Sequence, residues 1–110
     1  MRHAARIDTL QRLEQTIRQR LGASPDASYV AKLHARGLPV IARKLGEEAV
    51  EAITAALAGS REELTGEAAD VLFHLLVLLA EKDILLAEVL AELDRREGVS
   101  GLDEKASRQP

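Results

Sequence analysis

Two short acidic patterns are the part of this 110-residue sequence with the clearest potential for chemistry. The first is E-E-x-x-E at residues 47–51, and the second is E-x-x-D at residues 67–70. On a helix, a spacing of three leaves two side chains about 60° apart and roughly one turn apart along the axis. Each pattern therefore projects a pair of carboxylates in one direction. Such a pair repels itself and gains nothing for folding.

The surroundings of Glu48 favour a functional interpretation of the first pattern. On a helical projection, Glu48 falls between Leu45 and Ala52, inside an apolar stripe. Lys44 and Glu51 lie at the edge of that stripe. A carboxylate in such a place is costly unless it is paired or binds a metal ion. The alternative interpretation is an ordinary acidic face turned to solvent.

The second pattern lies on a helix with almost no polar face, where Asp70 shares one side with Glu67, His74 and Val77. Two adjacent helices would bring four carboxylates into one oxygen-rich and strongly negative site. Such a site suits Mg²⁺ or Mn²⁺, which bind carboxylates and water, better than it suits a soft metal.

The elements that must position these acids are helices. Apolar residues spaced by three and four predict an all-α bundle of four to five helices. Pro39 fits the first turn of one helix, and Ser60 with Glu63 forms a capping box that opens another. The predicted helices cover residues 7–21, 28–37, 38–58, 60–83 and 86–97. We expect one domain over residues 1–97 and a polar, flexible tail over residues 98–110.

Composition excludes several classes of protein. The chain has no cysteine, which excludes a disulfide scaffold, a thiol nucleophile and a cysteine-ligated metal. The net charge of -3 provides no basic stripe for nucleic acid. The most apolar stretch, residues 68–80, falls short of the ~20 residues that a membrane span needs. Because no signal peptide is visible, we expect a cytoplasmic protein that binds neither nucleic acid nor membrane.

The third and fourth helices carry more apolar surface than one small domain buries easily. The fourth is apolar on nearly every side from Val71 to Ala80, with only His74 interrupting it. The third has two apolar sides, one with Ile41, Leu45 and Ala52 and the other with Val50, Ile53 and Leu57. A tight core within a single chain is one explanation. We expect instead a homodimer whose subunits share the core, because the surplus would otherwise be exposed.

Three segments together resemble the phosphoribosyl-ATP pyrophosphohydrolase family of histidine biosynthesis, which belongs to the all-α MazG-type nucleotide pyrophosphohydrolases. They are S-Y-V-A-K-L at residues 28–33, K-L-G-E-E-A-V-E at residues 44–51 and E-A-A-D-V-L-F-H-L-L at residues 67–76. The resemblance covers nearly the whole chain. The acidic patterns alone identify only the superfamily, and the first segment joined to the second indicates this member.

The resemblance implies Mg²⁺-dependent hydrolysis of phosphoribosyl-ATP to phosphoribosyl-AMP and pyrophosphate. It implies metal binding by Glu48, Glu51, Glu67 and Asp70, which match the ligand positions of the family. We assign catalytic roles to Glu47, Glu48 and Glu51. Glu47 is either the general base or a group that contacts the metal ligands from outside, and the alternative is that it simply faces solvent. The chemistry agrees, because cations must neutralise a triphosphate and acidify the attacking water.

Three basic residues are candidates for binding phosphate. Lys44 lies one turn before Glu48 on the same edge of its helix, and Lys32 and Arg36 share a face of the second helix. For Arg36 a solvated side chain is the stronger interpretation. His74 is either an orienting partner of a ligand carboxylate or, the interpretation we favour, a hydrogen-bonded core residue.

Two other functions are compatible with the acidic patterns. A related enzyme that destroys unwanted nucleoside triphosphates would keep the acids, but the S-Y-x-A-K-L segment argues against it. A non-enzymatic dimerisation module would carry the acids on a solvent-exposed surface, and Mg²⁺ would not change its melting temperature. The number of metal ions and the phosphorus that water attacks stay open.

Overall fold

A computed structural model of the chain describes residues 2–97, with side chains described from residue 9 onward. Five helices form the described part: α1 (Arg2–Leu21), α2 (Tyr29–Arg36), α3 (Leu38–Ala58), α4 (Arg61–Glu81) and α5 (Leu86–Arg96). The all-α prediction is confirmed, and no strand occurs within these residues. The predicted tail over residues 98–110 lies outside the described residues.

Local signals set the ends of α2 and the start of α3. The Ser28 hydroxyl accepts a hydrogen bond from the Ala31 backbone N–H at 3.3 Å, which caps the start of α2. Gly37 has φ 98°, a left-handed conformation that favours glycine, and it separates α2 from α3. Pro39 stands in the first turn of α3, where its missing N–H costs no hydrogen bond.

The start of α4 confirms the predicted capping box. The Ser60 hydroxyl accepts from the Glu63 N–H at 3.1 Å, and the Glu63 carboxylate accepts from the Ser60 N–H at 3.2 Å. The helix ends at Glu81, slightly before the expected end near Asp83. The reason is local, because Asp83 adopts φ 55° and so leaves right-handed helical geometry.

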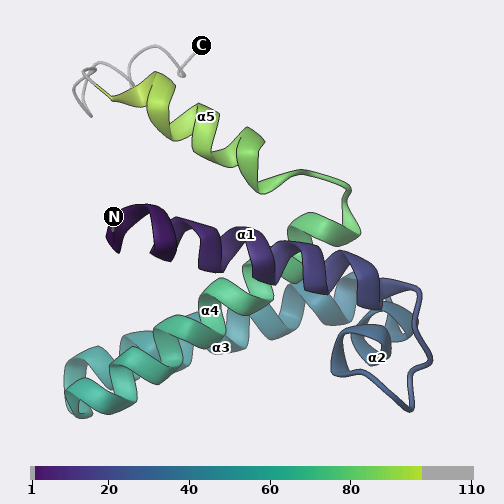
Figure 1. Cartoon of the computed structure of the whole chain (residues 1–110). Coiled ribbons are helices and arrows are strands. Elements are labelled where there is room, and N and C mark those ends of the chain that lie inside the picture. Colours follow the sequence, from purple (N-terminus) through teal and green to yellow (C-terminus); the bar gives the residue numbers. More distant parts are fainter. Residues whose placement is uncertain (1, 98–110) are drawn as a thin grey trace, which may run out of the picture.

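The helices pack as an antiparallel α3–α4 pair that α1 and α2 cover at one end (Figure 1). The most deeply buried side chains mark this covered end: Ile17 of α1, Leu33 of α2, Ile41 near the start of α3 and Val77 near the end of α4. The other end of the pair, which carries the α3–α4 turn, extends past the core. Packing therefore holds one half of each long helix and leaves the other half open.

The last helix is attached mainly through α1. Arg18 donates hydrogen bonds to the Asp83 carboxylate at 2.9 Å and to the Ile84 carbonyl at 3.2 Å. The Glu14 carboxylate accepts from the backbone N–H of Leu86 at 2.6 Å, which satisfies a donor at the first turn of α5. These bonds fix the turn before α5, whose far end stands away from the α3–α4 pair (Figure 1).

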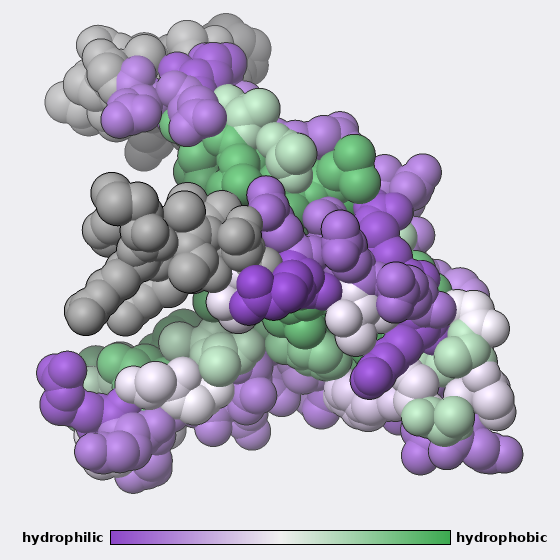
Figure 2. Space-filling model, in the orientation of Figure 1, coloured by the Kyte–Doolittle hydropathy of each residue, from purple (hydrophilic) through white to green (hydrophobic). Residues whose placement is uncertain are grey.

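Apolar side chains remain exposed on the uncovered half of the α3–α4 pair. On α3 they are Val50, Ile53 and Leu57, exposed by 61%, 59% and 83%. On α4 they are Leu64 and Leu72. Figure 2 shows apolar surface on this extended part and on the inner side of α5. Within the described residues no helix combines the length and the hydropathy that crossing a bilayer requires.

Candidate metal centre and active site

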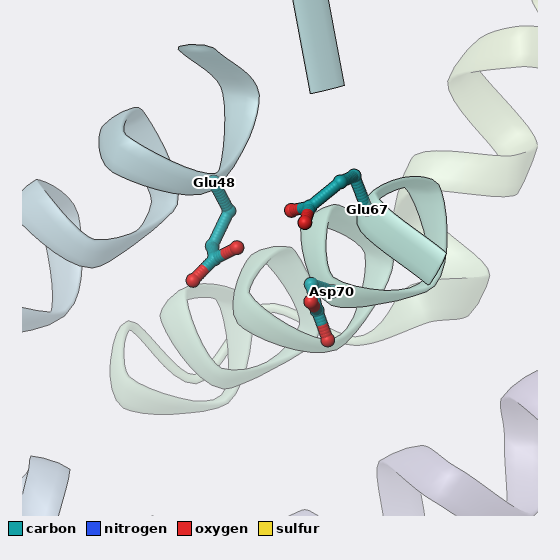
Figure 3. Close-up of side chains that lie close together, drawn as sticks. All are labelled: Glu48, Glu67 and Asp70. Carbon is teal, nitrogen blue, oxygen red and sulfur yellow. The ribbon is translucent and has the colours of Figure 1, made fainter. Parts of the chain in front are cut away.

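The antiparallel pairing of α3 and α4 brings acids from both helices together. One carboxylate oxygen each of Glu48, Glu67 and Asp70 lies within 4.8 Å of the others. Figure 3 shows Glu48 reaching in from α3, with Glu67 and Asp70 on α4 beside it. The two E-x-x-E/D spacings each supply one side of this cluster, and helix packing supplies the juxtaposition.

Two oxygen atoms of the cluster are buried without any hydrogen-bond partner. They are Oε2 of Glu48 and Oε2 of Glu67. The Glu48 side chain is only 12% exposed. A buried carboxylate oxygen left unpaired is costly, and the majority of buried polar atoms in proteins are paired. Because hard divalent cations bind groups of carboxylate oxygens, these two atoms fit Mg²⁺ or Mn²⁺.

The close approach of these carboxyl groups raises the pKa values of two of them. Hydrogen bonding to the Glu51 carboxyl, burial, and repulsion from Glu51 and Asp70 raise the pKa of Glu48 to about 7. Burial, followed by repulsion from Glu51 and Asp70, raises the pKa of Glu67 as well. The surrounding protein therefore favours the protonated forms, and a bound cation would reverse that preference.

The fourth predicted ligand, Glu51, lies beside the three-residue cluster. Its influence on the pKa of both Glu48 and Glu67 places it near each of them. Its residue is exposed, and its oxygen atoms fall outside the tight group of the other three. Of the four predicted metal ligands the structure thus brings three together and holds the fourth next to them.

Lys44 and Glu47 form an ion pair at the border of the site. The Lys44 ammonium lies 3.4 Å from Glu47 and 4.0 Å from Glu48. Glu47 also pairs with Arg43 at 3.5 Å, and half of its side chain is exposed. The negative charge that Tyr29 gains when it ionises, and then hydrogen bonding to Glu47, raise the pKa of Lys44. The structure therefore brings Lys44 to the cluster and turns Glu47 toward two cations.

The other two predicted phosphate-binding residues, Lys32 and Arg36, are exposed on α2. Neither forms an ion pair with the acids among residues 9–97. Helix α2 itself packs against α3, the helix that carries Glu48 and Glu51.

The sequence of this chain matches a known protein family over most of its length. A family model described as phosphoribosyl-ATP pyrophosphohydrolase matches residues 10–97. The chain belongs to this family. The match spans both acidic patterns and the S-Y-x-A-K-L segment, so the resemblance read from the sequence is confirmed.

Relatives in the phosphoribosyl-ATP pyrophosphohydrolase family are similar to this chain over nearly its whole length, and all three described here are named phosphoribosyl-ATP pyrophosphatase. The protein of Erythrobacter litoralis (strain HTCC2594) is 65% identical over 102 residues, which are 93% of this chain and 98% of the relative. The protein of Novosphingobium aromaticivorans is 63% identical, over 92% of this chain and 94% of the relative. The protein of Dinoroseobacter shibae is 63% identical, over 93% of this chain and all of the relative.

His74 has the hydrogen-bonded core role that the sequence favoured. It is 6% exposed, and its Nδ1 lies 2.8 Å from the backbone carbonyl oxygen of Asp70. It bonds the main chain of Asp70, so the structure does not show it orienting the Asp70 carboxylate. Its Nε2 lies 3.1 Å from the Tyr29 hydroxyl. Sequence reasoning gave Tyr29 no role, although it stands in the S-Y-x-A-K-L segment and is the chain's only tyrosine.

A cavity of about 310 Å³ adjoins the acids on the side of the α3–α4 turn. Its lining consists of acids and small residues: Glu51, Thr54, Ala55, Ala58, Gly59, Glu63 and Glu67. Sequence reasoning missed Thr54 and Glu63 here. The capping box accounted for Glu63, and only the packing of α4 on α3 places it beside the cavity.

Proposed function

We propose that this chain hydrolyses phosphoribosyl-ATP to phosphoribosyl-AMP and pyrophosphate at the acid cluster between α3 and α4. One structural observation carries the proposal, namely the two buried and unpartnered oxygen atoms of Glu48 and Glu67. They mark a place built for a cation rather than a solvated acidic face. The family match and the names of the relatives supply the substrate.

Mg²⁺ is the proposed cofactor, and Mn²⁺ is the alternative with the same ligand preference. The residues that would hold it are Glu48, Glu51, Glu67 and Asp70. When bound, the cation neutralises phosphate charge and lowers the pKa of water. The donor set fits, because it contains carboxylate oxygens from two helices and no soft ligand.

The chain's own residues perform the remaining steps. Lys44 binds the phosphate chain, since its ammonium already stands at the border of the acids. Lys32 and Arg36 add weaker attraction from α2. Water adds its oxygen to phosphorus, the anhydride bond between the α- and β-phosphates breaks, and the water proton passes to a carboxylate. Glu47 is our candidate for that base, because it is exposed and adjacent to Lys44.

The enzyme is proposed to act as a homodimer in the cytoplasm, with residues 1–97 forming the catalytic domain. The support for the dimer is the exposed apolar row of Val50, Ile53 and Leu57 on the uncovered half of α3. A second copy would cover this row and the apolar residues of α4 beside it.

Substituting Ile53→Glu tests the dimer. We expect this variant to sediment as a monomer, while Leu93→Glu, a matched change at an exposed leucine on α5, leaves the dimer intact. A wild type that is monomeric at micromolar concentration, with a melting temperature independent of concentration, would contradict the dimer.

Pyrophosphate release tests the activity directly. Phosphoribosyl-ATP, ATP and dUTP are compared with and without Mg²⁺, and we expect Mg²⁺-dependent release from phosphoribosyl-ATP far above the other two. Preference for ATP or dUTP would indicate the related enzyme that destroys unwanted nucleotides. No release from any of the three, with a melting temperature that Mg²⁺ does not change, would indicate a dimerisation module.

A further inference from the structure

The exposed side of α2 carries an aromatic ring and two cations in one row. Tyr29, Lys32 and Arg36 are spaced by three and four residues, so they lie along one face of the helix, and all three are exposed. The opposite face is buried through Val30 and Leu33. Neither cation forms an ion pair with an acid among the described side chains. Like charges four residues apart repel each other, and a bound anion would relieve that repulsion.

The aromatic ring of this row is held in place although it is exposed. Tyr29 stacks on Phe73 with ring centres 6.1 Å apart and planes inclined by 22°. It also meets the His74 ring edge-on at 5.9 Å, and its hydroxyl lies 3.1 Å from Nε2 of that histidine. Yet 48% of the residue is exposed. A ring that is both rigid and exposed loses little entropy when a flat ligand stacks on it.

The same contacts place the ring beside the acid cluster. Phe73 and His74 follow Asp70 by three and four residues on α4, which is about one helical turn. Nδ1 of His74 donates to the Asp70 backbone carbonyl at 2.8 Å. One imidazole ring therefore separates the Tyr29 hydroxyl from the main chain of a residue whose carboxylate belongs to the cluster. A ribose separates the base of a nucleotide from its phosphates, so a surface that binds the base must lie beside the metal centre and not in it.

The proposed substrate differs from ATP at its base. Phosphoribosyl-ATP carries a second ribose phosphate, which is attached to N1 of the purine. With the triphosphate at the acid cluster, this extra phosphate lies beyond the base, away from the acids that would repel it. Lys32 stands about 4.5 Å farther along α2 than Tyr29, on the same face. A cation there can reach a phosphate that is joined to a base stacked on Tyr29.

We propose that α2 binds the base end of the substrate: Tyr29 stacks on the purine, and Lys32 pairs with the phosphate of the phosphoribosyl group attached to it. This inference rests on the proposed function and deepens it, because it assigns the selection of phosphoribosyl-ATP over ATP to the extra phosphate at Lys32. It gives the tyrosine and the lysine of the S-Y-x-A-K-L segment one shared role.

Binding of the product tests this end of the site by itself. Phosphoribosyl-AMP keeps the base and the extra phosphate without the β- and γ-phosphates, and AMP lacks the extra phosphate as well. In calorimetric titration with Mg²⁺, we expect the wild type to bind phosphoribosyl-AMP about tenfold more tightly than AMP. Lys32→Gln should remove most of this difference by weakening the binding of phosphoribosyl-AMP. Lys82→Gln, at the exposed lysine that follows α4, is the matched control and should keep the difference.

Two substitutions of Tyr29 separate stacking from the hydrogen bond to His74. Tyr29→Leu removes the ring and should weaken binding of both monophosphates by about fivefold to a hundredfold. Tyr29→Phe removes only the hydroxyl, so it should recover most of the affinity that Tyr29→Leu loses. Because Tyr29 is half exposed, we expect both variants to fold, and their melting temperatures are measured alongside.

Four results would overturn the inference: a wild type that does not bind phosphoribosyl-AMP, equal wild-type affinities for the two monophosphates, an equal loss in Lys82→Gln and Lys32→Gln, or an equal loss in Tyr29→Phe and Tyr29→Leu. Failure of the proposed function has a different signature. The monophosphates would then bind as expected and respond to Lys32→Gln, while the wild type releases no pyrophosphate from phosphoribosyl-ATP. Hydrolysis of phosphoribosyl-ATP with wild-type kinetics in Lys32→Gln and Tyr29→Leu would overturn the inference alone.

Discussion

Replacing Glu48 by Gln should stabilise the metal-free protein, and the gain should depend on pH. The pKa of Glu48 is raised from 4.5 to about 7 in the folded chain. Below pH 4.5 the carboxyl is protonated in both states and costs nothing. Between pH 4.5 and 7 the unfolded chain loses the proton while the folded chain keeps it, so the unfolding free energy of the wild type falls as the pH rises. Above pH 7 the full cost remains.

The size of the effect follows from the two pKa values. Their difference corresponds to at most about 3 kcal/mol. Because the neighbouring carboxylates of Glu51 and Asp70 are exposed, solvent screens part of the repulsion. We therefore expect Glu48→Gln to raise the unfolding free energy by about 1–2 kcal/mol at pH 8. For a domain of this size that corresponds to roughly 5–15 °C in Tm.

The measurement is urea and thermal unfolding in EDTA at pH 4.5 and pH 8, at one protein concentration. We expect the difference between Glu48→Gln and the wild type to be small at pH 4.5 and full at pH 8. Asp94→Asn, an exposed acid on α5, serves as the matched control and should show no such pH dependence. Mg²⁺ should then stabilise the wild type by about 2.7 kcal/mol at a hundredfold excess over Kd, and Glu48→Gln much less.

The opposite sign would refute this reasoning. If Glu48→Gln lowers the unfolding free energy of the metal-free protein at pH 8 by more than about 2 kcal/mol, that loss matches a broken buried ion pair. Glu48 would then be a structural partner of Lys44, which lies 4.0 Å away. The metal-site interpretation would lose its physical basis.

Three further substitutions test the proposed phosphate-binding lysine and the starts of α4 and α5. Lys44→Met should lower kcat/KM roughly tenfold to a hundredfold with little change in Tm, because it removes a charged donor to phosphate; wild-type kinetics would make Lys44 an ordinary ion-pair residue. Ser60→Ala should cost about 1 kcal/mol in chemical unfolding, since it removes half of the α4 capping box, and an unchanged midpoint would mean that solvent replaces the cap. Glu14→Gln weakens the acceptor of the Leu86 N–H and should cost about 1 kcal/mol. Hydrogen exchange should then speed up first in α5, and faster exchange in α3 alone would contradict the described attachment.

The sequence predicted the features that depend on neighbours within about one helical turn. The Pro39 start and the capping box of Ser60 with Glu63 are set by contacts over three or four residues, and both are present in the structure. The spacing within each acidic pattern is local in the same sense, because helical geometry fixes it. The residues that carry the family resemblance are likewise read directly from the chain.

Packing between helices decided the rest. That Glu48 meets Glu67 and Asp70 depends on how far α3 slides along α4, which no spacing within one helix determines. Glu47 and Glu48 are adjacent in sequence, but about 100° of helical rotation turns Glu47 to the cations outside and Glu48 to the acids inside. Tyr29 finds His74 across 45 residues of chain only because α2 folds against the end of the α3–α4 pair. Interactions between residues close in sequence therefore determine where the helices lie and how the carboxylates are spaced on each. The burial of apolar side chains between the helices determines which of those carboxylates share a site.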